Sequence, residues 1–281
     1  VLYLLMTIAI GAFYAKGNNN SEDYFLGGRK LNGFVAALSA QASDMSGWLL
    51  MGLPGAIYLT GVGGDGWIAI GLFIGTTLNW LFIATKLRRY TIRANNSVTL
   101  PTYFENRFHD DKKVLMTVSS ITIVVFFLVY CASALSAGGQ LFESVFGIDY
   151  HVALTIGALV VLVYTFLGGF TAVCVTDFIQ GMLMLVGILA VPLFAYHFLT
   201  TGGTTLSAGL EASGADSANF LNLMKNGDGS NNIVSVISGL GWGLGYFGMP
   251  HILVRFMAVR DEKEMTKSKA TAISWVALSL G

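Results

Sequence analysis

Asp44 is the residue of this chain whose type and position most clearly predict chemistry. It lies inside a stretch that is otherwise apolar from Phe34 to Leu59. A stretch of this length can form a helix that crosses a bilayer, which takes about 20 residues. A carboxylate inside a membrane helix costs about 2.5–3.5 kcal/mol on insertion scales and usually faces an ion or substrate path. Asp44 therefore predicts a site that binds a cation within the membrane.

Two apolar stretches contain residues that interrupt a helix. In the first stretch these are Ser46, Gly47 and the pair Pro54-Gly55. The second stretch runs from Gly239 to Pro250 and has five glycines and one proline in twelve residues. Irregular backbone at membrane depth is tolerated only where it is buried in protein or lines a cavity. We therefore expect two broken helices whose backbone carbonyls turn toward a ligand.

The glycines allow two other interpretations. The run from Gly243 to Gly248 matches the GxGxxG pattern of dinucleotide sites, but no strand precedes it. Gly71 and Gly75 have a GxxxG spacing that more often serves close helix packing, and the glycines of residues 239–250 could serve packing too. The interleaved Trp242 and Tyr246 favour a lined cavity.

The composition predicts an all-α, polytopic membrane protein surrounded by lipid. The 281 residues are 54% hydrophobic and 11% charged, whereas a soluble domain has about 25% charged residues. Their mean hydropathy is +0.66. The formal net charge of zero indicates no nucleic-acid partner, and the two cysteines form no disulfide framework or metal motif. No nucleotide, metal or nucleophile motif indicates an enzyme. Both ends lie inside apolar runs, so we expect a single transmembrane domain over residues 1–281 that is truncated at each end.

Apolar windows predict about eight spans, with boundaries accurate to a few residues. They are Val1–Ala15, Phe34–Leu59, Gly66–Thr85, Val114–Phe142, Val152–Leu167, Thr171–Leu199, Ile233–Phe256 and a last span from Ala270 onward. Fifteen of the 16 lysines and arginines lie in the links that follow the first, third and seventh spans. Short loops rich in Lys and Arg stay cytoplasmic. We therefore expect an inner-membrane protein with its N-terminus outside, a tight inner turn at Gly168-Gly169 and an external segment Thr200–Asn232.

The second and seventh spans cross the membrane in opposite directions by this count. They are also the two interrupted spans, and they are five positions apart. Paired, Gly/Pro-interrupted helices in corresponding positions of two halves indicate the binding site of a secondary transporter. The pattern predicts a five-helix inverted repeat in which spans two to six are the first copy and span seven opens the second.

Six motifs resemble the sodium:solute symporter family, most closely its bacterial sodium/proline symporters. They are Leu26–Arg29, Ala42–Trp48, Leu141–Ser144, Tyr164–Phe170, Thr176–Gln180 and Gly241–Gly248. The resemblance implies a LeuT-type fold of two inverted five-helix repeats, of which this chain would contain the first and the start of the second. It also implies sodium-coupled uptake of L-proline by alternating access.

The resemblance implies roles for individual residues. The backbone carbonyls of Ala42 and Met45 would bind Na⁺, with Asp44 adding negative potential or a direct contact. The residues that would line the proline site are Trp48, Tyr130, Trp242, Tyr246 and Pro250. Asp177 would lie on the ion-exit route; the alternative is a carboxylate that caps a helix start.

Other polar residues receive less specific expectations. Arg29 and Arg255 match family arginines near an inner gate, although charges there mostly signal topology. His197 and His251 are expected at span ends without partners or a proton role. Gln41 and Met249 depart from the family pattern, in which Gly and Gln are usual, so strict proline selectivity is an open question. The remaining sodium ligands, which the family has on a later helix, would lie beyond Gly281.

Three rival functions stay open on sequence alone. The chain could belong to a sodium-coupled symporter for another small amino acid or carboxylate. It could belong to a proton-coupled carrier in which Asp44 titrates. It could also be the symporter-like membrane sensor of a signalling protein. Oligomeric state and stoichiometry are not determined by the sequence.

Overall fold

The computed structural model describes residues 2–280, and these residues are helical almost throughout. The elements are α1 (Leu2–Ala15), α2 (Ser21–Leu26), η1 (Gly27–Arg29), α3 (Gly33–Gly47), η2 (Trp48–Gly52), α4 (Leu53–Thr60), α5 (Val62–Leu78), η3 (Asn79–Ala84), α6 (Thr85–Arg93), α7 (Leu100–Phe108), α8 (Val114–Phe146), α9 (Tyr150–Thr201), α10 (Leu206–Ala212), α11 (Ser217–Phe220), α12 (Ile233–Trp242), η4 (Gly243–Phe247), α13 (Pro250–Ala258) and α14 (Glu262–Leu280). Extended pairing within residues 2–280 is limited to two isolated bridges, Leu31 with Val259 and Lys225 with Asn231.

Within residues 2–280, three helices are long and apolar enough to cross a membrane. They are Val62–Arg93, Val114–Phe146 and Tyr150–Thr201, and the bent pair Ile233–Phe247 and Pro250–Ala258, with a 44° bend, makes a fourth candidate. The count of eight spans therefore stays a prediction. The difference arises because several expected spans are short or interrupted: α1 has only 14 residues, and the span over α3 and α4 is broken.

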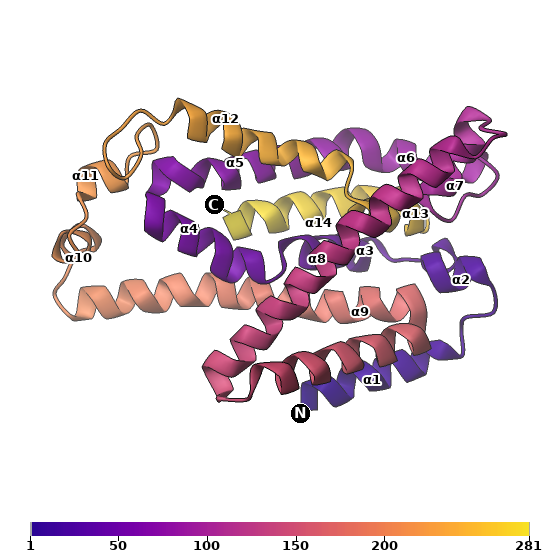
Figure 1. Ribbon diagram of the computed structural model, residues 1–281, viewed down its shortest axis with the longest axis horizontal. Helices are drawn as coiled ribbons and strands as arrows, with labels where there is room; N and C mark the ends of the chain where they lie inside the picture. The colour runs from indigo at the N-terminus through magenta and orange to yellow at the C-terminus, as the bar shows by residue number, and fades with distance from the viewer. Residues whose placement is uncertain (1, 281) are drawn as a thin grey trace.

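The helix α9 contains two of the expected spans. It has 52 residues, and its backbone leaves the helical region at Gly169 (φ 61°, ψ −158°). Figure 1 shows the two arms running in opposite directions, the first beside α1. The reversal is tight because Gly168 packs on the backbone of Gly11, and only glycine adopts the conformation of Gly169 without strain. The predicted turn at Gly168-Gly169 is confirmed.

The interhelical links gather at two opposite ends of the bundle. Figure 1 shows α2, α6, α7 and α13 at one end, and α10, α11, the α4–α5 turn and the α8–α9 turn at the other. The first end, called the basic end below, holds most of the lysines and arginines. This separation agrees with the alternation of basic and nonbasic links along the sequence.

The two interrupted segments run in opposite directions, and α12 lies along an outer face of the bundle (Figure 1). The helix α3 packs against α9, α13 and α14, and α5 packs against α12 and η4. The contact of α5 with α12 is backbone to backbone, because a Cβ on Gly71 would collide with the carbonyl of Gly239 and one on Gly75 with Gly243. The GxxxG spacing of α5 therefore serves helix packing, and so do two of the glycines in residues 239–250.

Candidate functional site

The break in the second predicted span lies at Ser46, two residues after Asp44. Ser46 has φ 40° and ψ −154°, outside the helical region, and a π-helical turn follows over Trp48–Gly52. A positive φ on a residue with a Cβ costs about 1–3 kcal/mol and is typical of binding sites. Pro54 lies within the first two residues of α4, where a proline fits a regular helix. A π-helical turn ends at Gly52, directly before this helix, so the expectation that Pro54-Gly55 help to open the helix stays a prediction.

Asp44 joins the two interrupted segments. Its Oδ2 accepts a hydrogen bond of 2.5 Å from the hydroxyl of Tyr246, 202 residues away in η4. The backbone carbonyl of Tyr246 in turn accepts a 2.8 Å bond from Nδ2 of Asn79, which begins η3. Tyr246 thus links three elements from distant parts of the chain, α3 through its hydroxyl and η3 through its carbonyl.

The expected sodium ligands lie beside this carboxylate. Ala42 and Met45 are 7% and 1% exposed, so their backbone oxygens are inside the protein. The carbonyl of Met45 accepts a hydrogen bond from the backbone N–H of Trp48. Each carbonyl oxygen has two lone pairs, so this bond leaves one free. Oxygen donors beside a carboxylate are the ligand type that hard cations take, and the residues present fit a sodium ion.

The aromatic residues expected to line a substrate site form two groups. Trp48 and Trp242 stack on each other with ring centroids 5.6 Å apart and an interplanar angle of 22°. The ring of Tyr130, from α8, stacks on His251 at 5.6 Å and 24°, and its hydroxyl donates a 3.0 Å bond to the carbonyl of Ser43. Both groups adjoin the segment around Asp44.

Pro250 opens α13, and Met249 is the residue that precedes this helix. Pro250 is therefore placed at the end of the second break, and its expected role in lining the solute site stays a prediction. Met249 is partly buried against the core. Gln41 is buried, and its Nε2 donates a 3.0 Å bond to the carbonyl of Ala272 in α14. This bond gives Gln41 a role in packing α3 against α14.

Asp177 lies in a polar group inside the protein in which one of its carboxylate oxygens accepts three hydrogen bonds. Its Oδ2 accepts bonds from Ser39 at 2.7 Å, Ser43 at 3.0 Å and Arg255 at 2.9 Å. The guanidinium of Arg255 also donates to both serines and to the carbonyl of His251. Arg255 is more than a topology signal, because its side chain is only 7% exposed and is ion-paired with Asp177.

His251 also differs from its expectation. It lies in the first turn of α13 rather than at a span end, and its ring contacts Phe127 and Tyr130. Both imidazole nitrogens are buried and, among residues 2–280, make no hydrogen bond. Sequence reasoning missed Ser39, Ser43 and His251, although the four-residue spacings Ser39–Ser43 and His251–Arg255 place each pair on one helix face.

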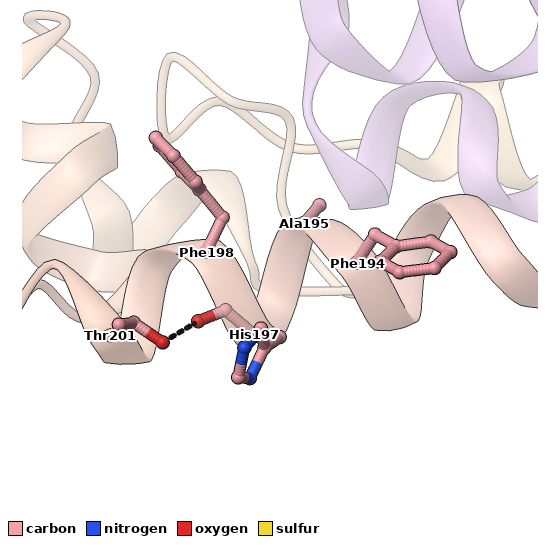
Figure 2. A pocket seen from close by; sticks show the side chains of 5 residues that line it. All are labelled: Phe194, Ala195, His197, Phe198 and Thr201. Carbon is pink, nitrogen blue, oxygen red and sulfur yellow. Dashed lines mark hydrogen bonds between the residues drawn. The ribbon is translucent and has the colours of Figure 1, made fainter.

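One surface pocket lies apart from this site. Figure 2 shows its lining residues, Phe194, Ala195, His197, Phe198 and Thr201, all near the end of α9. Phe194 and Phe198 are 74% and 80% exposed, so the pocket is an outward-facing apolar surface. It contains none of the residues expected to bind an ion or solute.

Comparisons with known proteins agree with this architecture. The model of the sodium:solute symporter family matches residues 24–280. Sodium/proline symporters of Staphylococcus aureus strains JH9 and NCTC 8325 / PS 47 are each 44% identical over 280 residues, which is 99% of this chain and 53% of the relative. The chain thus spans about half the length of the curated relatives it matches.

A solved structure shares the fold. It is the substrate-bound outward-open state of a Na⁺-coupled sialic acid symporter, with a TM-score of 0.77 and 19% identity over 99% of this chain and 58% of that chain. The expected fold class, an all-α polytopic protein with a LeuT-type inverted-repeat arrangement, is confirmed by this likeness and by the helices themselves.

Proposed function

Because the chain belongs to the sodium:solute symporter family, we propose that its full-length protein takes up a small solute together with Na⁺ by alternating access. The observation that carries this proposal is the bond between Asp44 and Tyr246, which joins the two interrupted helices at a half-buried carboxylate. A transporter with a LeuT-type arrangement binds its ion and substrate at such a pair of breaks. In this proposal residues 1–281 form a single transmembrane domain.

The sodium ion binds at the first break, against the carbonyls of Ala42 and Met45 and within the potential of Asp44. Binding there orders the segment around Ser46, whose strained conformation needs support from neighbours. Only a difference in sodium affinity between the outward and inward states can couple the ion to the solute. One charge that crosses 100 mV yields about 2.3 kcal/mol, which at about 1.36 kcal/mol per decade supports roughly 50-fold accumulation.

The proposed solute is L-proline. The relatives at 44% identity are named sodium/proline symporters, and the lining suits a small apolar ring with two charged groups. Trp48 and Trp242 offer aromatic faces, Tyr130, Tyr246 and Pro250 close the sides, and Asp44 supplies an acceptor for the ammonium. Met249 and the packed Gln41 leave other small amino acids or carboxylates as the alternative.

The ion leaves the site toward the basic end past Asp177. This carboxylate is paired with Arg255, so the pair must part before Asp177 can face a passing cation. In our proposal the basic end is cytoplasmic, the protein lies in the inner membrane among lipid, and the N-terminus is outside. The support is the clustering of Lys and Arg at one end of the bundle.

The test is uptake of radiolabelled L-proline by the full-length protein in proteoliposomes. We expect uptake that requires Na⁺ and grows with an inside-negative potential, and we expect Asp44→Asn to lower the apparent sodium affinity at least tenfold. Asp65→Asn is the matched control, because Asp65 lies on the first turn of α5 near the opposite end. Uptake that persists in choline buffer and follows a pH gradient would indicate proton coupling. Absence of all uptake, together with solute-dependent control of a linked signalling domain, would favour the sensor alternative.

A further inference from the structure

A zwitterionic amino acid needs a donor for its carboxylate as well as an acceptor for its ammonium. The structure removes the tyrosines as donors, because each hydroxyl already donates within the protein: Tyr130 to the carbonyl of Ser43 and Tyr246 to Asp44. Arg255 is the cation in the adjoining turn of α13, and its guanidinium is used by Asp177, Ser39, Ser43 and the carbonyl of His251. The carboxylate donor must therefore be another group.

His251 has an uncommitted donor in the right neighbourhood. A neutral imidazole always has one N–H and one acceptor nitrogen, and both nitrogens of His251 are buried without a partner in the described part of the chain. Leaving a buried polar group unpaired costs free energy. A ring that keeps two such atoms beside a binding site is therefore suited to a bound ligand.

The position of His251 is fixed by its neighbours. Its ring stacks on Tyr130 at 5.6 Å and meets Phe127 edge-on at 5.3 Å. Its backbone carbonyl accepts a bond from Arg255, and Pro250 precedes it at the start of α13. These contacts hold the imidazole between residues that we assign to the solute site, next to the segment of Asp44.

We propose that His251 is a specificity-determining residue whose imidazole N–H donates a hydrogen bond to the carboxylate of the transported amino acid. The inference rests on the proposed function and names a contact within that same site. The ammonium lies toward Asp44 and the carboxylate toward His251. Hydrogen bonds to a charged acceptor are about twice as strong as neutral ones, so a neutral carboxamide in place of the carboxylate should bind much more weakly.

The indole N–H groups of Trp48 and Trp242 are the competing donors. Both indoles are only partly buried, and Trp242 is 49% exposed, so water can satisfy them. The nitrogens of His251 have no such access. Without the solute carboxylate, the imidazole N–H has no partner, whereas each indole N–H can bond to water. The carboxylate therefore contributes more free energy at His251 than at an indole, and this difference favours His251 as the donor.

The experiment measures selectivity in the full-length protein. Uptake of labelled L-proline is competed with unlabelled L-proline and with L-prolinamide, which lacks the carboxylate. The ratio of the two inhibition constants does not depend on how much protein has folded. It is determined for the wild type, His251→Phe, which keeps a ring without an N–H, and His251→Gln, which keeps an N–H donor. His197→Phe is the control, since His197 is exposed on α9.

We expect only His251→Phe to lose both its affinity for proline and its ability to distinguish proline from prolinamide. His251→Phe should raise the KM for proline about tenfold to a hundredfold and bring the proline-to-prolinamide ratio close to one. His251→Gln should retain part of both, and the sodium concentration for half-maximal uptake should be unchanged in each. If His251→Phe gives too little uptake, equilibrium binding of labelled proline supplies the same ratio.

Three results would overturn the inference. A proline-to-prolinamide ratio in His251→Phe within twofold of the wild type would do so. The second result is a proline-to-prolinamide ratio that falls in Trp48→Phe or Trp242→Phe and stays intact in His251→Phe. The carboxylate donor would then be an indole. A change in sodium dependence as large as the change in KM would indicate an ion or folding role instead. If the wild type takes up no proline with sodium, the proposed function fails first, and that outcome is distinct from these.

Discussion

Two buried polar clusters lie side by side in this protein and are bonded in opposite ways. The closed cluster is Ser39, Ser43, Asp177 and Arg255, in which the carboxylate and the guanidinium each have several partners. The open cluster is Asp44, Thr76, Asn79, Tyr246 and His251, in which one oxygen of Thr76, one of Asn79 and both nitrogens of His251 are buried without a partner in residues 2–280. The clusters share α3 and α13, where Ser43 adjoins Asp44.

The difference separates residues that hold the fold from residues that bind. A buried polar group needs a partner, and the closed cluster supplies all of its own. The open cluster keeps unused donors and acceptors, which a solute or an ion can satisfy. We therefore expect substitutions in the closed cluster to act mainly on stability and substitutions in the open cluster mainly on transport.

Removal of Asp177 should have the largest effect on stability. Asp177→Ala leaves the charge of Arg255 buried and unpaired, so we expect the free energy of unfolding to fall by about 3–5 kcal/mol. Thermal or denaturant unfolding of the full-length protein in detergent measures it. Asp228→Ala, at an exposed acid near the opposite end, is the control. The double variant Asp177→Leu with Arg255→Leu should recover most of the loss, and failure to recover would show that the pair is not acting through its charge.

Arg29 extends the comparison to the basic end. Its guanidinium donates to the carbonyls of Met257 and Ser97, both at 2.8 Å, and to the side chains of Thr91 and Asn96. Arg29→Met would leave two carbonyls without donors at about 1–3 kcal/mol each, so we expect a loss of at least about 2 kcal/mol. Arg93→Met, at an exposed arginine on α6, is the control. Equal effects of the two variants would contradict a structural role for Arg29.

Asp44 provides the sharpest contrast, because it belongs to the open cluster and has a single hydrogen-bond donor, Tyr246. Asp44→Asn removes a half-buried charge and keeps the shape of the side chain. We expect the unfolding free energy to change by less than about 1 kcal/mol while the apparent sodium affinity falls at least tenfold, about 1.4 kcal/mol. Unfolding and sodium-dependent uptake, measured on the same preparation, separate the effect on stability from the effect on sodium affinity. A large loss of stability with sodium affinity intact would place Asp44 in the closed cluster.

Glu264 gives the smallest expected effect and tests the closed arrangement through pH. Its carboxylate is 3% exposed and is bonded by Lys267 and by the backbone N–H of Gly33, both at 2.7 Å. The Lys267 ammonium, and then the Gly33 N–H, lower the pKa of Glu264 below its ordinary value of 4.5. The stabilisation is therefore present above pH 4.5 and is lost as the pH falls through the lowered pKa.

The measurement is the unfolding temperature of the full-length protein between pH 7 and pH 3. The unfolding temperature of Glu264→Gln should fall less steeply below pH 4.5 than that of the wild type, because the variant has no proton to take up at this site. Glu143→Gln, at an exposed residue of α8, should leave the shape of the curve unchanged. Parallel curves for the wild type and Glu264→Gln would show that this contact does not contribute.

Local composition explains what could be predicted about the fold. Glycine, proline and isolated charge located both interrupted segments, the turn at Gly168-Gly169 and the GxxxG packing of Gly71. These signals act over a few residues, so they are visible in a sequence. Pro54 is less informative on its own, because a proline is also compatible with the first turn of a regular helix.

The pairing of side chains between helices could not be predicted in the same way. The bond between Asp44 and Tyr246 spans 202 residues, and it depends on how far each helix is rotated about its axis. The same rotation turns Arg255 inward to Asp177 and leaves His251 unpaired beside Tyr130. No spacing within one segment specifies these rotations, so the sequence predicted Asp44 and Asp177 as important residues without predicting their partners.

The turn at Gly169 limits how the interior can move. No flexible loop connects the two arms of α9, so one arm cannot slide past the other along its axis. The only displacement left to them is a change in the angle at a single residue. Because Asp177 lies eight residues beyond that vertex, a small change of angle displaces its carboxylate along a short arc, and its distance from the turn stays constant.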